Sequence, residues 1–110
     1  MEELLGITPP DDRLGCLQDV HWYDGAWGYF PTYTLGAMTA AQLYSAALEE
    51  KPDISTSIPQ GDFTPLTDWL IHNVHALGSS LGAGEMVEKA TGRPLDGAAF
   101  TRHLKSRYLT

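Results

Sequence analysis

An imidazole and two phenols lie close together in one short stretch of this sequence. His21 is followed within twelve residues by Tyr29 and Tyr33, with two glycines before the first tyrosine. Histidine and tyrosine side chains can donate hydrogen bonds to an oxygen that gains negative charge during a reaction. Asp19 is placed to accept the other ring N–H of His21 and so to fix its tautomer. The spacing alone leaves a second interpretation open, a buried aromatic cluster around a structural histidine.

The elements that must position these residues are predicted to be a glycine-kinked loop over 21–30 and the long helix that follows it. Pro31 favours the first turn of a helix, and Lys51-Pro52 ends it, so we expect a helix from Pro31 to about Glu50. Its charge appears only at its end, and such a helix is typical of the interior of a larger body. The isolated chain is therefore expected to self-associate or to expose an apolar patch. One apolar face is expected to hold Tyr33, Ala37, Ala40, Ala41, Tyr44, Ala47 and Leu48.

Shorter helices are expected on both sides of this long one, and we find no alternating strand pattern. Asp62 and Asp96 are candidate N-caps. The prediction is an all-α region of three to four helices plus a glycine- and aromatic-rich loop, forming one unit over residues 1–110. The shorter helical segments are expected at 1–5, 13–20, 63–77, 85–90 and 97–108, and an irregular connection at 53–61. The apolar stripe of the 63–77 helix is expected to comprise Phe63, Leu66, Leu70, Val74 and Leu77.

Charge, cysteine count and the absence of long apolar segments narrow the expected partners and location. The formal net charge of -7 argues against a nucleic-acid partner. The single cysteine, Cys16, cannot form an internal disulfide, which fits a reducing compartment. No signal peptide and no membrane span are apparent, so a cytoplasmic protein is expected.

The run Leu17-Gln18-Asp19-Val20-His21-Trp22 closely resembles the Q-D-x-H-W signature of carboxypeptidase Taq, a family of metallocarboxypeptidases. The next run, Gly-Tyr-Phe-Pro-Thr-Tyr-Thr-Leu-Gly over residues 28–36, is similar to the segment that follows that signature in the family. The remainder of the chain resembles the family's last helices more weakly. The resemblance therefore covers essentially the whole chain, and its first block is the most specific part.

The resemblance implies a zinc- or cobalt-dependent exopeptidase that removes single residues from peptide C-termini, with a large, mostly helical body around a deep groove. In the family an H-E-x-x-H helix and a later glutamate hold the metal, and this sequence contains no H-E-x-x-H. The chain is therefore expected to be the C-terminal region, with no metal ligand or cofactor of its own and no activity without the missing N-terminal part. The family's enzymes are homodimers, and whether this chain forms a homo-oligomer is left open.

Matching the motifs residue by residue gives the expected site. The resemblance implies that His21, with Tyr29 or Tyr33, binds the carbonyl of the bond to be cut, as the catalytic group of this chain. It also implies that Gln18, Asp19 and Trp22 line the substrate groove. The alternative function is a non-catalytic helical module, from a split gene, that binds peptides or other proteins.

One weaker pattern is a potential metal site elsewhere in the chain. Asp68, His72 and His75 have the spacing to share one face of a helix. That face lies opposite the expected apolar stripe of the 63–77 helix. We therefore interpret the three residues as an ordinary solvated surface.

Overall fold

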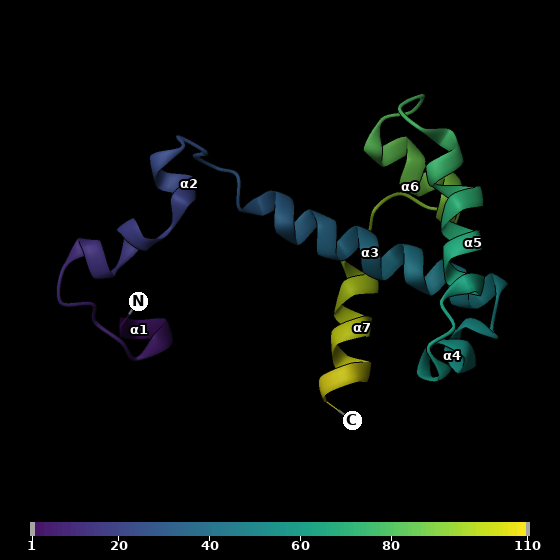
Figure 1. The fold of residues 1–110 in the computed structure, drawn as a ribbon, viewed down its shortest axis with the longest axis horizontal. Helices are drawn as coiled ribbons and strands as arrows, with labels where there is room; N and C mark the ends of the chain where they lie inside the picture. The colour runs from purple at the N-terminus through teal and green to yellow at the C-terminus, as the bar shows by residue number, and fades with distance from the viewer. Residues whose placement is uncertain (1, 110) are drawn as a thin grey trace. The chain divides into compact units, whose positions relative to one another are not determined.

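The computed structural model describes residues 2–109, and every regular element among them is helical (Figure 1). The helices are α1 (Glu2–Leu5), α2 (Val20–Tyr23), α3 (Pro31–Glu50), α4 (Ile54–Ser57), α5 (Thr64–Asn73), α6 (Ala83–Thr91) and α7 (Gly97–Tyr108). Four 3-10 turns accompany them: η1 (Asp12–Leu14), η2 (Cys16–Gln18), η3 (Ile58–Gln60) and η4 (His75–Leu77). The all-α prediction is confirmed. None of the described helices has both the length and the apolar character that a membrane span needs.

The chain divides into two compact units, Met1–Tyr33 and Thr34–Thr110. The first unit holds α1, α2 and the first turn of α3. The second holds the rest of α3 and the helices that follow it. Each unit is described here by itself.

The predicted helix over 13–20 is wrong, because the backbone breaks at Gly15. This glycine has φ -115° and ψ -118°, and it separates η1 from η2. A side chain at this position would lie only 3.2 Å from the ring of Pro9. Asp11 caps the first turn by accepting a 2.8 Å hydrogen bond from the backbone N–H of Leu14. The residues of the expected helix thus form two separate turns.

The stretch 21–30 is only partly the loop that was expected. Its first three residues belong to α2, and a loop follows from Asp24. Gly25 and Gly28 then adopt positive φ angles of 70° and 76°, where an L side chain is strained. These two glycines turn the chain between α2 and α3. At the N-terminal end the expected helix stop at Gly6 is confirmed by its φ of 66°, while Met1 lies outside the described residues.

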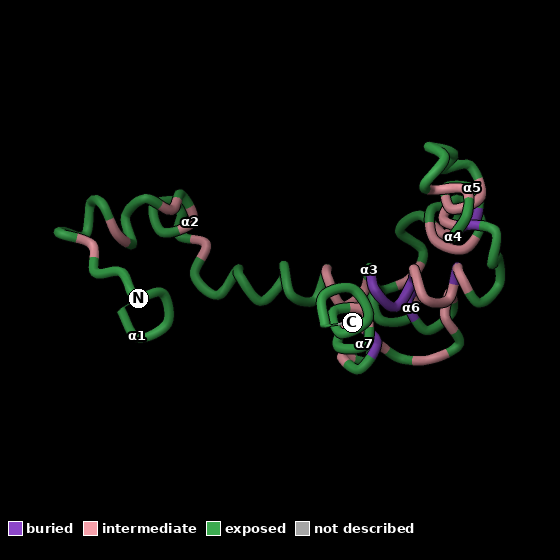
Figure 2. The backbone as a smooth tube through the Cα atoms, turned by 90° about the horizontal axis from the view of Figure 1, so that it is seen from below, coloured by how far each residue is buried: buried purple, intermediate pink, exposed green. Residues whose placement is uncertain are grey.

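The long helix α3 has the predicted bounds, but its buried face differs from the prediction. Ala41 and Ala47 are buried as expected, whereas Tyr33 and Ala40 are exposed. The burial concentrates in the second half of the helix (Figure 2). Its buried set also includes a polar residue, Gln42, that the apolar pattern did not mark.

The core of the second unit forms around the C-terminal half of α3. Leu43 and Ala47 of α3 pack there with Ile54 of α4 and Trp69 of α5. Partly buried side chains of the later helices, including Leu66, Leu70, Val74 and Ala90, surround this cluster. The indole N–H of Trp69 donates a 2.7 Å hydrogen bond to Glu50. The core is therefore small and ties α3, α4 and α5 together.

Two predictions for the segment after α3 need correction. The expected irregular connection at 53–61 contains α4 and η3, which end at Gly61 with a left-handed φ of 80°. The expected single helix over 63–77 is interrupted at Val74, whose φ and ψ of -122° and -62° are not helical. The helix α5 ends at Asn73, and η4 follows as a separate turn. The side chain of Asp62 accepts a 2.9 Å hydrogen bond from the N–H of Thr64.

The last two helices largely match the predictions. The helix α6 begins two residues earlier than expected, because Glu85 accepts a 3.0 Å hydrogen bond from the N–H of Gly82 and so caps its start. It also ends one residue later than expected. The bounds of α7 are as predicted. Asp96 caps it by accepting a 2.9 Å hydrogen bond from the N–H of Ala98.

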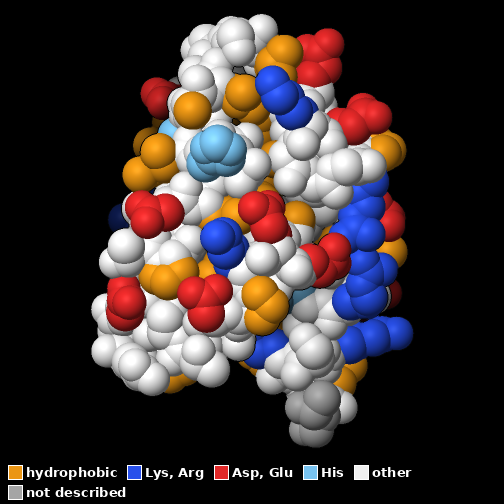
Figure 3. All heavy atoms as spheres, turned by 90° about the vertical axis from the view of Figure 1, so that its right-hand side faces the viewer, with side chains coloured by type: hydrophobic (Ala, Val, Ile, Leu, Met, Phe, Trp, Pro, Cys, Tyr) orange, Lys and Arg blue, Asp and Glu red, His pale blue; other side chains and the backbone are white. Residues whose placement is uncertain are grey.

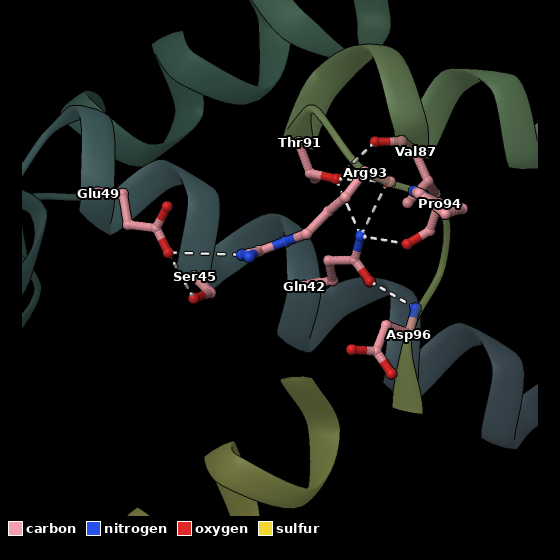
Figure 4. A network of polar contacts seen from close by, with 8 residues as sticks. All are labelled: Gln42, Ser45, Glu49, Val87, Thr91, Arg93, Pro94 and Asp96. Carbon is pink, nitrogen blue, oxygen red and sulfur yellow. Dashed lines mark hydrogen bonds and ion pairs between the residues drawn. The ribbon is translucent and has the colours of Figure 1, made fainter. Parts of the chain in front are cut away.

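A buried amide connects α3 to the segment between α6 and α7 (Figure 4). The Nε2 of Gln42 donates to the Thr91 hydroxyl at 2.9 Å and to the carbonyls of Arg93 and Pro94 at 3.2 and 3.0 Å. Its Oε1 accepts from the N–H of Asp96 at 2.8 Å. This side chain is fully buried, and every hydrogen-bonding group it has is used. Gln42 therefore fixes where α6 ends and α7 begins relative to α3.

On the face shown in Figure 3, Lys and Arg side chains gather along the right-hand edge and also lie near the top and the centre, and acidic side chains are spread among them. Within residues 2–109 the lysines and arginines form one ion pair with an acidic side chain, at 3.5 Å between Arg93 and Glu49. Both side chains are largely exposed, so this pair contributes little to stability.

Candidate functional site

The local structure around His21 is built by an aspartate at the start of a short helix. Asp19 is the N-cap of α2, and its Oδ1 accepts a 2.9 Å hydrogen bond from the backbone N–H of His21. The next residues complete one helical turn and reverse at Gly25 and Gly28. The chain then enters α3 at Pro31. The chain thus doubles back, so that Tyr33 in the first turn of α3 lies next to the imidazole of His21.

His21 uses both ring nitrogens. Its Nδ1 lies 2.6 Å from Oδ1 of Asp19, and its Nε2 lies 2.9 Å from the hydroxyl of Tyr33. The imidazole is 24% exposed and the Asp19 side chain is 41% exposed. The expected pairing of the aspartate with the imidazole is therefore present. It is reachable from solvent and does not lie in a sealed core.

Three aromatic rings surround the imidazole. The ring of Tyr29 is stacked on it at 5.5 Å between centroids, Phe30 is tilted at 5.0 Å and Tyr33 meets it edge-on at 5.9 Å. Tyr29 and Tyr33 also contact each other edge to face at 5.3 Å. The structure thus brings His21, Tyr29 and Tyr33 together. It adds Phe30, which the sequence analysis missed although this residue lies within the Gly-Tyr-Phe-Pro-Thr-Tyr run.

Hydrogen bonding to the ionised form lowers the pKa of Asp19. The largest cause is the backbone N–H of His21, followed by its ring, and together they hold this pKa below its ordinary value of 3.8. Because the folded-state pKa lies below the unfolded one, the ionised carboxylate stabilises the fold above the unfolded pKa. That contribution is lost as the pH falls through the folded value.

We therefore expect the Asp19 carboxyl to titrate below pH 3.8, with the first turn of α2 loosening as it becomes protonated. Carbon-detected NMR of the side-chain carboxyl measures the midpoint directly. In a His21→Ala variant the backbone donor remains, so the midpoint should rise only part of the way. A midpoint at or above 3.8 in the unmodified chain would contradict this account.

The other two predicted groove residues lie at the edge of this cluster. The Nε2 of Gln18 donates to the carbonyl of Arg13 at 2.5 Å, so its amide nitrogen is committed to the backbone of η1. Trp22 contacts Trp27 at 4.8 Å and Phe30 at 6.2 Å between ring centroids. Beside these two tryptophans lies a shallow hollow of about 300 Å³. It is lined by Cys16, Leu17, Trp22, Tyr23 and Trp27.

The described residues offer no metal centre. No group of three or more histidine, cysteine, aspartate or glutamate side chains within residues 2–109 is arranged to hold a metal ion. The premise that Asp68, His72 and His75 share one helix face is wrong for His75, because α5 ends before it. The part of the chain that the structure describes therefore does not by itself form a site that fits a metal ion.

The family model described as carboxypeptidase Taq (M32) metallopeptidase matches residues 1–108. The chain is 41% identical over 109 residues to Thermostable carboxypeptidase 1 of Pyrococcus furiosus, and 40% identical over 107 residues to Carboxypeptidase 1 of Bacillus subtilis. These matches cover 99% and 97% of this chain, but 22% and 21% of the two relatives. The chain thus spans about a fifth of the length of the curated relatives it matches.

Solved structures agree in fold as well as in sequence. Trypanosoma cruzi metallocarboxypeptidase 1 superimposes with a TM-score of 0.89 at 41% identity, over 100% of this chain and 23% of that one. The M32 carboxypeptidase from Deinococcus radiodurans gives a TM-score of 0.87 at 39% identity, over 97% of this chain and 22% of that one. Both matches extend over nearly all of the chain, including the segment that carries His21.

Proposed function

This chain belongs to the carboxypeptidase Taq (M32) metallopeptidase family, and from that premise we propose that it forms part of the peptide-binding wall of a metallocarboxypeptidase. In this proposal it is the C-terminal region of an enzyme that removes single residues from peptide C-termini. Its own contribution is to bind the carbonyl oxygen of the bond to be cut. The observation that carries the proposal is the solvent-accessible cluster of His21, Tyr29 and Tyr33.

The chemistry of such a cluster is to stabilise negative charge on an oxygen. When an amide carbonyl is attacked, its oxygen becomes an anion, and donors that are already in position stabilise it without further reorganisation. Asp19 holds the imidazole at 2.6 Å, and the aromatic contacts hold both tyrosines against it. The hydroxyl of Tyr29 has no hydrogen-bond partner among residues 2–109, and its side chain is exposed. Tyr29 is therefore available to donate to a substrate oxygen.

We place the remaining parts of the enzyme outside this chain. The metal, which we propose to be zinc or cobalt, and the general base belong to the rest of the polypeptide, and this stretch alone is expected to release no residue from a peptide. Gln18 and Trp22 are proposed to border the substrate groove, with the apolar hollow beside Trp22 facing a substrate side chain. The free, exposed thiol of Cys16 supports a cytoplasmic location, because such thiols persist in reducing compartments.

The proposal predicts that a Tyr29→Phe substitution in a full-length family member lowers activity without changing metal content. The ring and its stacking on His21 stay, but the hydroxyl is lost, so we expect kcat/KM to fall by about tenfold, one hydrogen bond's contribution. Metal content, measured by atomic emission, should not change. The matched control is Tyr44→Phe on α3, which belongs to the other compact unit and whose ring lies 6.5 Å from that of His103. Full activity in the Tyr29→Phe enzyme would contradict the proposal.

A further inference from the structure

The positions of the protons in the His21 cluster follow from the aspartate. An ionised carboxylate accepts hydrogen bonds and donates none. Asp19 already accepts the backbone N–H of His21 through the same oxygen that lies 2.6 Å from Nδ1. That short contact is a hydrogen bond only if Nδ1 carries the proton. The neutral imidazole is therefore protonated on Nδ1 and has a bare lone pair on Nε2.

The bare Nε2 then determines the direction of the hydrogen bond to Tyr33. Since Nε2 has no proton to give, the Tyr33 hydroxyl is the donor in the 2.9 Å contact. A phenol has one proton, and here it is directed at the imidazole. While His21 is neutral, neither His21 nor Tyr33 has a proton left for a substrate oxygen.

We propose that Asp19 is a positioning residue that acts through His21 to control the hydroxyl of Tyr33. When a proton from solvent binds Nε2, the new N–H donates to the oxygen of Tyr33. The Tyr33 O–H then rotates away from the ring and points outward as a donor. One proton is gained and no covalent bond between heavy atoms changes. This inference rests on the proposed function, and it assigns Tyr33, switched by the protonation of His21, as a donor beside Tyr29.

Few groups contact the imidazole of His21, so a change in its protonation acts directly on few side chains. From α2 the only charged group facing it is Asp19, and from the segment before α3 the neighbours are the phenol of Tyr29 and the ring of Phe30. From the first turn of α3 the neighbour is Tyr33. No basic side chain among residues 2–109 contacts the ring. The imidazole is thus contacted by one carboxylate, one stacked phenol and two further aromatic rings.

The tautomer can be tested apart from catalysis. In a full-length family member labelled with ¹⁵N-histidine, the neutral form of His21 should show a protonated Nδ1 and an unprotonated Nε2. The Tyr33→Phe enzyme should keep this tautomer, because Asp19 still holds Nδ1. The Asp19→Asn enzyme should lose it, because the amide no longer requires a donor. A wild-type imidazole protonated on Nε2 would overturn the switch and leave the proposed function standing.

The pH profile tests the consequence. We expect kcat/KM of the wild-type enzyme to fall as pH rises through the titration of His21, since Tyr33 is then committed to Nε2. Tyr33→Phe should remove that dependence and lower the acidic plateau by roughly tenfold. Asp19→Asn should weaken the same dependence, because the imidazole is then no longer held in one tautomer. A Tyr33→Phe profile with the same fall would overturn the switch. Unchanged activity of both variants at every pH would overturn the proposed function itself.

Discussion

Replacing His21 by alanine in a full-length family member is expected to lower kcat by about 10²–10³, because the imidazole that positions both donor phenols is lost. The substitution deletes the group that holds Tyr33 through Nε2 and on which Tyr29 stacks. It leaves the two phenols without the ring that positions them. Steady-state kinetics with a short peptide measures the loss, which should appear mainly in kcat.

The metal content of the His21→Ala enzyme should match that of the wild type, because Asp19 and Tyr33 occupy both ring nitrogens of His21. His75→Ala is the matched control. That histidine is exposed, and it lies in the turn η4 of the other unit. It should leave kcat unchanged. Loss of metal from the His21→Ala enzyme, or wild-type turnover, would contradict the role assigned to His21.

The second large effect concerns stability. A Gln42→Leu variant should lose about 3–5 kcal/mol of unfolding free energy, because a fully buried amide is replaced by an apolar side chain. The carbonyls of Arg93 and Pro94 and the N–H of Asp96 would then lose their partner. Urea unfolding of the chain, followed by circular dichroism, measures the difference.

Two further variants separate the hydrogen bonds of Gln42 from its volume. Gln42→Glu keeps the shape but directs a carboxylate at two carbonyls, so it should be at least as destabilising at neutral pH and recover partly on acidification. Ser45→Ala, on the same helix, removes only a 3.4 Å exposed contact to Glu49 and should change stability little. If Gln42→Leu proves as stable as Ser45→Ala, the amide does not anchor α6 and α7 to α3.

Local sequence signals predicted the elements that have clear ends. Pro31 marked the start of α3, and Asp96 marked the start of α7, because both act within one helical turn of their own position. Breaks that depend on tertiary packing were missed. Gly15 interrupts a predicted helix where it passes the ring of Pro9, and Val74 ends α5 from within an apolar stripe.

Burial was harder to predict than helix position. The apolar pattern placed Leu66, Leu70 and Val74 on the buried stripe of α5, but Trp69 is the residue of that helix that is buried. Gln42 looked like an interruption of an apolar face. It is buried because its partners, the backbone groups at 93–96, are about fifty residues away in the chain. No window of local sequence contains that information.

The contacts of the candidate site also differ in how far the sequence predicted them. The contact between Asp19 and His21 spans only two residues, so the sequence predicted it. The N-cap role of Asp19 was missed, because this residue was placed inside a helix over 13–20. Which tyrosine bonds to His21 depends on the reversal at Gly25 and Gly28, and the sequence left Tyr29 and Tyr33 as equal choices. The structure separates them, with Tyr33 hydrogen-bonded to the imidazole and Tyr29 stacked on it.

The affinity of a phosphinate peptide, whose tetrahedral oxygen mimics the anion formed at the attacked carbonyl, tests most directly whether these groups bind that oxygen. An enzyme binds such an analogue through the contacts that stabilise the transition state. The account predicts that His21→Ala weakens the phosphinate by about the same 10²–10³ by which it lowers turnover, and leaves the affinity of a product amino acid unchanged. Equal phosphinate affinity in the two enzymes would show that His21 and its tyrosines face something other than the reacting carbonyl.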